Sequence, residues 1–350
     1  MSISHEFLKR LNIDHPIIQG PLGGGPSTPE LVAAVSNAGG LGSLGAAYST
    51  PDQIASDIQR IKSLTSKPFH VNLFAGGWDA NVNADPQPML DILAEIHHTL
   101  GLPAPTPPIS KPDPFPEQLE VVLAEQPAIF SFTFGIPSSD AIARLKHRGI
   151  QIFGTATTVA EARLLTGAGV DAVVAQGAQS GAHRGTFAGS FESSMVPTLE
   201  LVRGIKAAVD APVIASGGLM DGRDISGSLA AGAAAAALGT AFLVSTESAA
   251  PQVHKRAILS AERDSTVITS AFSGRPARGI PNKFIQTLTD RENSILPYPL
   301  QNAFTRAMRT AAAQQGNPDF LSLWAGQGLT RARSMSAADL VNALVAEMQQ

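Results

Sequence analysis

The sequence has no cysteine among its 350 residues. This absence excludes disulfides, thiolate zinc sites, iron–sulfur clusters and a cysteine nucleophile. It also suits a reducing compartment, so we expect a cytoplasmic protein. Charge is scarce as well, because only 15% of the residues are charged where about 25% is usual. The 25 Lys and Arg against 29 Asp and Glu give a net charge of −4, which argues against a nucleic-acid partner.

Long apolar runs are also missing. No stretch approaches the roughly 20 consecutive apolar residues of a membrane-spanning helix, and the N-terminus has no signal-peptide core, so we expect no membrane association. Apolar residues nevertheless make up 44% of the chain, which excludes disorder as its main state. A folded chain with a large core is therefore expected.

The sequence does contain a regular alternation of short apolar runs and helix-like segments. Most of the runs precede a predicted helix, such as Ser27–Ala38, capped by Ser27 or Thr28, and Thr50–Leu64. This alternation predicts a parallel sheet covered by helices, and eight units favour a (β/α)8 TIM barrel over a doubly wound open sheet. The eight predicted strands are His15–Pro21, Leu41–Ala47, Pro68–Ala75, Ala128–Gly135, Gln151–Ala156, Asp171–Gly177, Pro212–Gly217 and Ala234–Phe242.

Two regions depart from this alternation of predicted strands and helices. Residues 76–116 hold one predicted helix, Met89–Leu100, and a proline-rich stretch. We interpret them as an insertion after strand three, with a plain linker left open. Residues 246–350 are predicted to form a helical extension that packs on the barrel of residues 1–245.

The ends of the predicted strands have a distinctive chemistry. In a barrel, catalytic groups lie at the C-terminal ends of the strands. Here those ends carry amides, hydroxyls and glycines, including Asn72 and Gln176, but no carboxylate and no lysine. Metal sites, Schiff-base aldolases and glycosidases are therefore not expected, whereas a flat polar heterocycle would suit these groups.

Glycines follow the last two predicted strands, as Gly217-Gly218 and Gly239-Thr240. Barrels frequently bind phosphate in these two loops, where glycine lets backbone N–H groups approach the phosphate oxygens. The two pairs together predict a phosphate site.

One histidine stands out among eight. His183 lies in a glycine-rich loop after strand six, where it suits a general base or an anion-binding group. Arg184 beside it either attracts an anion or faces solvent. His70, inside strand three, is expected to be a packed core histidine. The histidines expected on the surface are His5, His97, His98, His147 and His254.

Several motifs together resemble the nitronate monooxygenases, and class I of that family most of all. They are GPLGGG, STPELVAAVSNAGGLGSLG, VNLF, SFTFG, QGAQSGAHRG, ASGGLMDGRD and ALGTAFL, followed by Tyr298–Asn302 and Leu323–Gly328. The resemblance runs from about His15 to Ser245 and resumes at the last two motifs.

The resemblance implies a barrel with non-covalent FMN and His183 as the catalytic histidine. It places Gly20, Pro21 and Leu22 against the flavin ring, and Asn72 and Gln176 on the ring or the ribityl chain. Gly181 would line the cofactor site. The residues implied at the phosphate are Gly217, Gly218, Ala237, Leu238, Gly239 and Thr240.

The implied reaction is the oxidation of an alkyl nitronate by O2 to a carbonyl compound and nitrite. An FMN-dependent NAD(P)H reductase of quinones or enoyl thioesters on the same barrel is the alternative, and a flavin-binding protein without turnover is a third. A homodimer is left open. One departure concerns the family pattern E-A-G-G-H-R-G, because Gln179 replaces the acid and Ala182 replaces a glycine.

Overall fold

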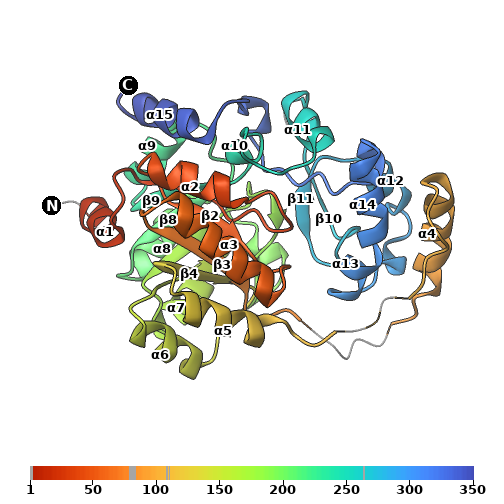
Figure 1. Cartoon of the computed structure of the whole chain (residues 1–350), viewed down its shortest axis with the longest axis horizontal. Coiled ribbons are helices and arrows are strands. Elements are labelled where there is room, and N and C mark those ends of the chain that lie inside the picture. The colour runs from red at the N-terminus through yellow and green to blue at the C-terminus, as the bar shows by residue number, and fades with distance from the viewer. Residues whose placement is uncertain (1–2, 79–83, 108, 110, 263–264) are drawn as a thin grey trace.

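Eight parallel strands form a barrel surrounded by helices (Figure 1). The structure is a computed structural model that describes residues 3–78, 84–107, 109, 111–262 and 265–350. Around the barrel the strands follow the order β1-β9-β8-β6-β5-β4-β3-β2, and a parallel bridge between Ile18 and Leu41 joins the two ends. The predicted TIM barrel is thus confirmed. Its strands are β1 Ile17–Gln19, β2 Gly42–Gly45, β3 Phe69–Phe74, β4 Ile129–Thr133, β5 Gln151–Ala156, β6 Ala172–Gln176, β8 Val213–Ser216 and β9 Ala235–Leu238.

Helices cover the outside of the barrel. The Thr28 hydroxyl accepts from the Leu31 N–H, so Thr28 and not Ser27 caps α2. A short helix begins at Thr240, which makes the predicted strand Ala234–Phe242 too long. Helix α1 (Ile3–Leu11) packs Phe7 and Leu11 against the base of the barrel. The other helices around the barrel are α2 Pro29–Asn37, α3 Pro51–Leu64, α5 Phe115–Glu125, α6 Ser139–His147, α7 Val159–Gly167, α8 Thr198–Ala208, α9 Gly222–Ala230, α10 Thr240–Leu243 and α15 Ala337–Met348.

Alternation along the strands separates two environments. In β3, Val71 and Leu73 pack outward among the helices, whereas His70 and Asn72 point into the barrel. Inward positions near the strands' C-terminal ends carry polar side chains, and those near the other end carry apolar ones such as Phe153. The barrel is therefore plugged at its base and polar where its chemistry is expected.

A second core lies beside the barrel and joins two distant parts of the sequence. Helix α4 packs its apolar face against residues that follow the barrel, including Phe272, Phe284 and Met308. In Figure 1, α4 lies beyond α12–α14 at the far side from α1. Residues 79–83, 108 and 110 of the predicted insertion lie outside the described residues. The elements here are α4 Gln87–Thr99, α11 Gln252–Leu259, β10 Val267–Thr269, β11 Ala277–Gly279, α12 Lys283–Thr287, α13 Leu300–Phe304 and α14 Arg306–Gln314, with 3-10 turns at Glu292–Ser294 and Pro318–Phe320. Further 3-10 turns lie at Glu192–Ser194, in the loop after β6, and at Leu329–Arg331, before α15.

The C-terminal extension is not purely helical, which corrects the prediction. Strands β10 and β11 pair with β7 (Ala182–His183), in the loop after β6, to form a three-stranded antiparallel sheet. His183 pairs with Ala277, so the C-terminal part of the chain holds the loop that carries the predicted catalytic histidine. In the described part of the chain, no helix is long and apolar enough to cross a membrane.

Candidate active site

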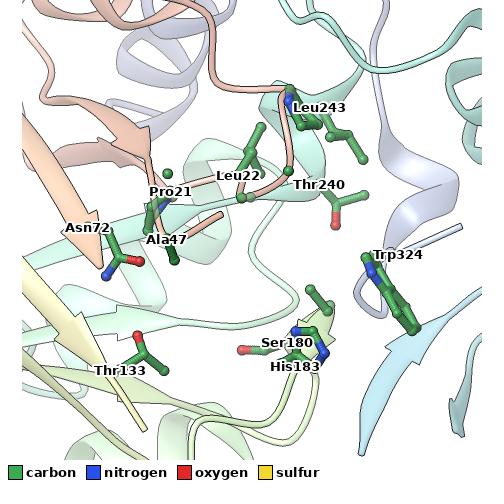
Figure 2. Close-up of a pocket in the computed structure, with 18 of the residues that line it drawn as sticks. Pro21, Leu22, Ala47, Asn72, Thr133, Ser180, His183, Thr240, Leu243 and Trp324 are labelled. Atoms are coloured by element: carbon green, nitrogen blue, oxygen red, sulfur yellow. The ribbon is translucent and has the colours of Figure 1, made fainter. Parts of the chain in front are cut away.

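A cavity of about 920 Å³ lies at the C-terminal ends of the barrel strands. Its walls come from the barrel loops and from the C-terminal segment that carries Asn302 and Trp324. Figure 2 shows Asn72 and Thr133 on one side of this space, Trp324 on the opposite side and His183 between them. Ligand sites of small molecules and cofactors typically span roughly 300–1,000 Å³, so this cavity is large enough for a nucleotide-sized group.

Two amide side chains lie at the floor of the cavity. Asn72 Nδ2 donates to Ser131 Oγ over 2.7 Å. Gln176 Nε2 donates to the His183 carbonyl over 3.0 Å, and its Oε1 accepts from the Gly185 N–H over 2.7 Å. Gln176 therefore holds the histidine loop, and it retains one amide N–H for a bound group.

Glycines form a closely packed edge of the cavity. Gly217 and Gly218 adopt φ values of +123° and +73°, which side chains rarely adopt. A Cβ at Gly217 would lie 2.5 Å from Ser180 Oγ, and one at Gly181 would lie 2.5 Å from the Gly326 nitrogen. Glycine at these positions is therefore what lets the loops of this edge pack against one another so closely.

His183 is enclosed by aromatic rings from three parts of the chain. Phe134 and Trp324 have ring centroids 5.9 Å and 5.8 Å from the imidazole, and Tyr298 lies at 6.4 Å. Its Nε2 lies 2.8 Å from Ser273 Oγ. The ring is half-buried because one edge lines the cavity.

Electrostatics keep the His183 ring neutral. Burial lowers its pKa to about 3, and the nearby cations Arg275 and Arg309 act in the same direction. Burial also raises the pKa of Tyr48 and Tyr298, so both phenols stay protonated. The cavity wall thus presents the neutral imidazole of His183, the neutral phenol of Tyr48 and the positive charge of Arg309, an arrangement that favours an anion.

Arg184 neither attracts an anion nor faces solvent. Its Nη1 donates to the carbonyls of Gln176 and Gly177 over 2.6 and 2.7 Å, and its Nε donates to Ser194 Oγ. Glu161 holds the same loop from the other side, because its Oε1 accepts from the Phe187 N–H over 2.6 Å. Both alternatives from the sequence are wrong, and Arg184 is a buried anchor of the histidine loop.

Comparison with known proteins agrees with this geometry. A family model described as nitronate monooxygenase matches residues 5–347. The chain belongs to the nitronate monooxygenase family. The resemblance drawn from the sequence motifs is thus confirmed, and membership in this family makes the chain an oxidoreductase of the monooxygenase type.

Relatives of the family extend over nearly the whole chain. A "Probable nitronate monooxygenase" of Staphylococcus haemolyticus (strain JCSC1435) is 40% identical and covers 100% of this chain and 98% of that protein. One from Staphylococcus aureus (strain Newman) is 39% identical over 99% of this chain and 98% of its own length.

Solved structures share the fold. A nitroalkane oxidase from Streptomyces ansochromogenes is 40% identical with a TM-score of 0.90, over 98% of this chain and 97% of that one. FabK from Thermotoga maritima is 28% identical with a TM-score of 0.78, over 98% and 96% of the two chains.

The structure brings nearly all of the predicted site residues to one cavity. Leu238 is the exception, because its side chain is fully buried and its carbonyl accepts from the Gly20 N–H over 2.8 Å. The predicted residues on the cavity wall are Gly20, Pro21, Leu22, Asn72, Gln176, Gly181, His183, Gly217, Gly218, Ala237, Gly239 and Thr240. Their proposed contacts with a cofactor stay predictions.

The two departures from the family pattern have different structural consequences. Gln179 Oε1 accepts from the N–H and the hydroxyl of Thr198 over 2.9 and 2.8 Å, so the amide oxygen makes contacts that a carboxylate oxygen could also make. Ala182, where the family pattern has glycine, has a φ of +59°. The loop therefore keeps a conformation that suits glycine, and the alanine bears the strain.

Other residues of the site were not identified from the sequence. Ser131, Ser180 and Tyr48 line the cavity, and no sequence pattern distinguishes them from ordinary strand-end or loop residues. His254 was expected on the surface, but it is only 6% exposed and lines the cavity, with Nε2 3.0 Å from the Trp324 carbonyl. His97 is likewise buried. No cluster of three or more metal-ligating side chains occurs in the described part of the chain.

Proposed function

We propose that the protein oxidises alkyl nitronates with O2 to carbonyl compounds and nitrite, and that FMN is its cofactor. The observation that carries the proposal is the neutral His183 on the cavity wall, enclosed by aromatic rings and near two arginines in a chain of this family. A nitronate is a small organic anion, and these surroundings favour such an anion over a neutral substrate. The cysteine-free sequence suits a reaction in the cytoplasm.

The residues of the cavity fit FMN. Asn72 and Gln176 offer amide groups to a ring, and Gly217 and Gly218 line the cavity with backbone alone, where no side chain separates a bound group from the peptide N–H groups. Thr240 Oγ1 accepts from the Gly326 N–H over 2.9 Å, so its own proton is free to donate to a phosphate oxygen. When bound, FMN supplies the electron-accepting ring that amino acids lack.

The protein's contribution is to bind the substrate, exclude water and handle a proton. Ser273 Oγ donates its proton to the Arg275 carbonyl over 3.2 Å. In the hydrogen bond between Ser273 and His183, the serine oxygen is therefore the acceptor and His183 Nε2 carries the hydrogen. The other nitrogen, Nδ1, then has a free lone pair. Nδ1 is therefore the atom that takes the α-proton of a neutral nitroalkane, and once protonated it donates to a nitro oxygen.

An anaerobic spectroscopic experiment tests the proposal. We expect the purified protein to be yellow, to lose oxidised-flavin absorbance with ethylnitronate and to keep it with NADH or NADPH. Under air, nitrite release should follow nitronate consumption. Loss of absorbance with NAD(P)H alone would favour the reductase alternative, and a protein that cannot be reconstituted with FMN would contradict both functions.

A substitution tests the residue. His183→Asn should lower kcat/KM for neutral nitroethane by about 100-fold or more while the FMN content stays that of the unaltered protein. Exposed His147→Asn serves as the matched control. Normal turnover by His183→Asn would contradict the role given to His183.

A further inference from the structure

A chain of four polar side chains crosses the inside of the barrel at the floor of the cavity. Ser43 Oγ lies 2.8 Å from His70 Nδ1, and His70 Nε2 lies 2.6 Å from Ser131 Oγ. Asn72 Nδ2 donates to the same Ser131 Oγ over 2.7 Å. All four side chains are at most 5% exposed, so their hydrogen bonds to one another are shielded from bulk water.

The strand register explains why these side chains meet. Ser43 on β2 pairs with His70 on β3, and Asn72 on β3 pairs with Ser131 on β4. His70 and Asn72 are two residues apart on one strand, so both point into the barrel. Parallel pairing therefore aligns the four groups across three neighbouring strands, with Asn72 and Ser131 at the end nearer the cavity.

The hydrogens along this chain can be assigned one by one. Ser43 is fully buried, and His70 Nδ1 is the only hydrogen-bond partner of its hydroxyl in the described part of the chain. Because a buried hydroxyl seldom leaves its proton unused, Ser43 donates to Nδ1. Burial lowers the pKa of His70 to about 3, so the ring is neutral and its single hydrogen lies on Nε2.

Ser131 is thereby left with one free group. Its oxygen accepts from His70 Nε2 and from Asn72 Nδ2, which occupies both lone pairs. No acceptor for its proton occurs among the described residues, and Ser131 lines the cavity. Asn72 Oδ1 likewise has no protein donor there and lines the same cavity. A donor and an acceptor therefore lie side by side at the cavity floor.

We propose that Ser131 Oγ–H and Asn72 Oδ1 bind the adjacent C=O and N–H of a lactam-type ring, and that His70 holds Ser131 as the donor. His70 is a positioning residue, since it acts through Ser131. The inference rests on the proposed cofactor, because the pyrimidine ring of FMN carries such an edge. Ser131 thus adds a second point of recognition to Asn72.

The hydrogen assignment is tested without any ligand. We expect 15N NMR of the histidine-labelled protein, with His70 assigned through His70→Gln, to show a neutral ring protonated at Nε2. Ser43→Ala removes the donor to Nδ1 and should shift that nitrogen's resonance. A His70 that is charged or protonated at Nδ1 would overturn the inference.

The binding pair is tested with FMN and with 3-methyl-FMN, which lacks the ring N–H. We expect Ser131→Ala to raise the FMN dissociation constant about three- to tenfold, measured by flavin fluorescence. Ser131→Thr keeps the hydroxyl and should restore binding. Ser228→Ala removes a fully buried serine hydroxyl that donates to the Asp224 carbonyl, so it controls for general destabilisation and should bind FMN normally.

The unaltered protein should bind 3-methyl-FMN about three- to tenfold more weakly than FMN. Equal affinity for the two flavins, or FMN binding by Ser131→Ala equal to that of Ser228→Ala, would overturn the inference, as would failure of the unaltered protein to bind FMN. Weakened FMN binding in Ser131→Ala without any nitronate turnover would instead contradict the proposed reaction and leave this inference standing.

Discussion

His183 Nε2 lies 2.8 Å from Ser273 Oγ, and 90 positions of sequence separate the two residues. Ser273 is held in turn by the backbone of Arg275, because its Oγ donates to the Arg275 carbonyl and accepts from the Arg275 N–H over 3.2 and 3.3 Å. The protonation of the imidazole at the cavity is therefore determined by a turn in the C-terminal part of the chain.

Replacing this serine should distinguish two kinds of substrate. In Ser273→Ala, the His183 ring loses the acceptor that keeps its hydrogen on Nε2, and Nδ1 becomes a poorer base. We expect kcat/KM for neutral nitroethane to fall about three- to tenfold and kcat/KM for preformed ethylnitronate to change less than about twofold. The pH dependence of the two reactions should be measured in parallel. Equal losses with both substrates would show that Ser273 has only a structural role.

The strained residue beside His183 should respond to glycine. An alanine in the left-handed region costs about 1–2 kcal/mol, and Ala182 has a φ of +59°. Glycine relieves this strain but adds about 0.5–1 kcal/mol of backbone entropy cost. We therefore expect Ala182→Gly to raise the free energy of unfolding by about 0.5–1 kcal/mol in urea titrations of the FMN-free protein.

A matched control for this change lies in a helix. Ala143 is exposed within α6, so Ala143→Gly should destabilise the protein by about 1 kcal/mol. Both substitutions replace alanine by glycine, but they should change the free energy of unfolding in opposite directions. Destabilisation by both would show that the loop around Ala182 is not strained.

The buried histidines should make the fold sensitive to acid. Burial lowers the pKa of His70 to about 3 and that of His254 to about 4, whereas an unfolded histidine titrates near 6.5. Below about pH 6.5 the unfolded chain binds more protons than the folded one. Each of these histidines should therefore lower the free energy of unfolding by up to about 1.4 kcal/mol per pH unit between pH 6.5 and its folded pKa.

Urea titrations from pH 7 to pH 5 measure this slope. His254→Gln can still donate to the Trp324 carbonyl but cannot titrate. The free energy of unfolding of this variant should therefore fall less steeply with decreasing pH, by the contribution of one proton. His147→Gln, on the surface of α6, is the matched control at an exposed position. A slope that is the same in all three proteins would mean that His254 is protonated in the folded state.

Position 179, where this chain has glutamine and the family pattern has glutamate, should accept glutamate without loss of cofactor binding. Gln179 Oε1 already accepts two hydrogen bonds from Thr198, and a glutamate oxygen can do the same. We expect Gln179→Glu to bind FMN within about twofold of the unaltered protein. Gln179→Met should lose about 1–2 kcal/mol of stability because the Thr198 N–H loses its acceptor, whereas the Thr198 hydroxyl keeps the Gly217 carbonyl 2.9 Å away. A large loss of FMN affinity in Gln179→Glu would show that charge at this position repels the cofactor.

Much of the barrel was predictable because its signals are local. Apolar runs with glycine or polar ends mark its strands, and Thr28 and Thr50 each accept from a first-turn N–H as their positions before a proline predict. The strand predicted at Ala234–Phe242 extends beyond the observed end at Leu238, because a run of alanine and glycine carries no signal for where a strand ends. The helix Phe115–Glu125 was missed because it follows a proline-rich stretch.

The site was predictable in its barrel half only. Asn72 lies near the end of β3, Gln176 ends β6 and Gly218 follows β8, so topology alone brings them to one end of the barrel. The C-terminal half is brought there by pairing between β7 and β11, which joins Ala182 and Arg278. Pairing between such distant segments leaves no periodicity in either one, and for the same reason the buried positions of His97 and His254 were missed.

The sequence by itself determined the barrel, the strand ends that face its cavity and, through its motifs, the family. Those properties follow from residue spacing, because a strand's alternation and a helix's cap are set by neighbours in the chain. Only the tertiary structure decided which nitrogen of His183 meets Ser273 and which hydroxyl His70 leaves free. Hydrogen bonds of this kind join residues from separate elements, and their direction depends on burial and distance, which emerge only when the chain is packed.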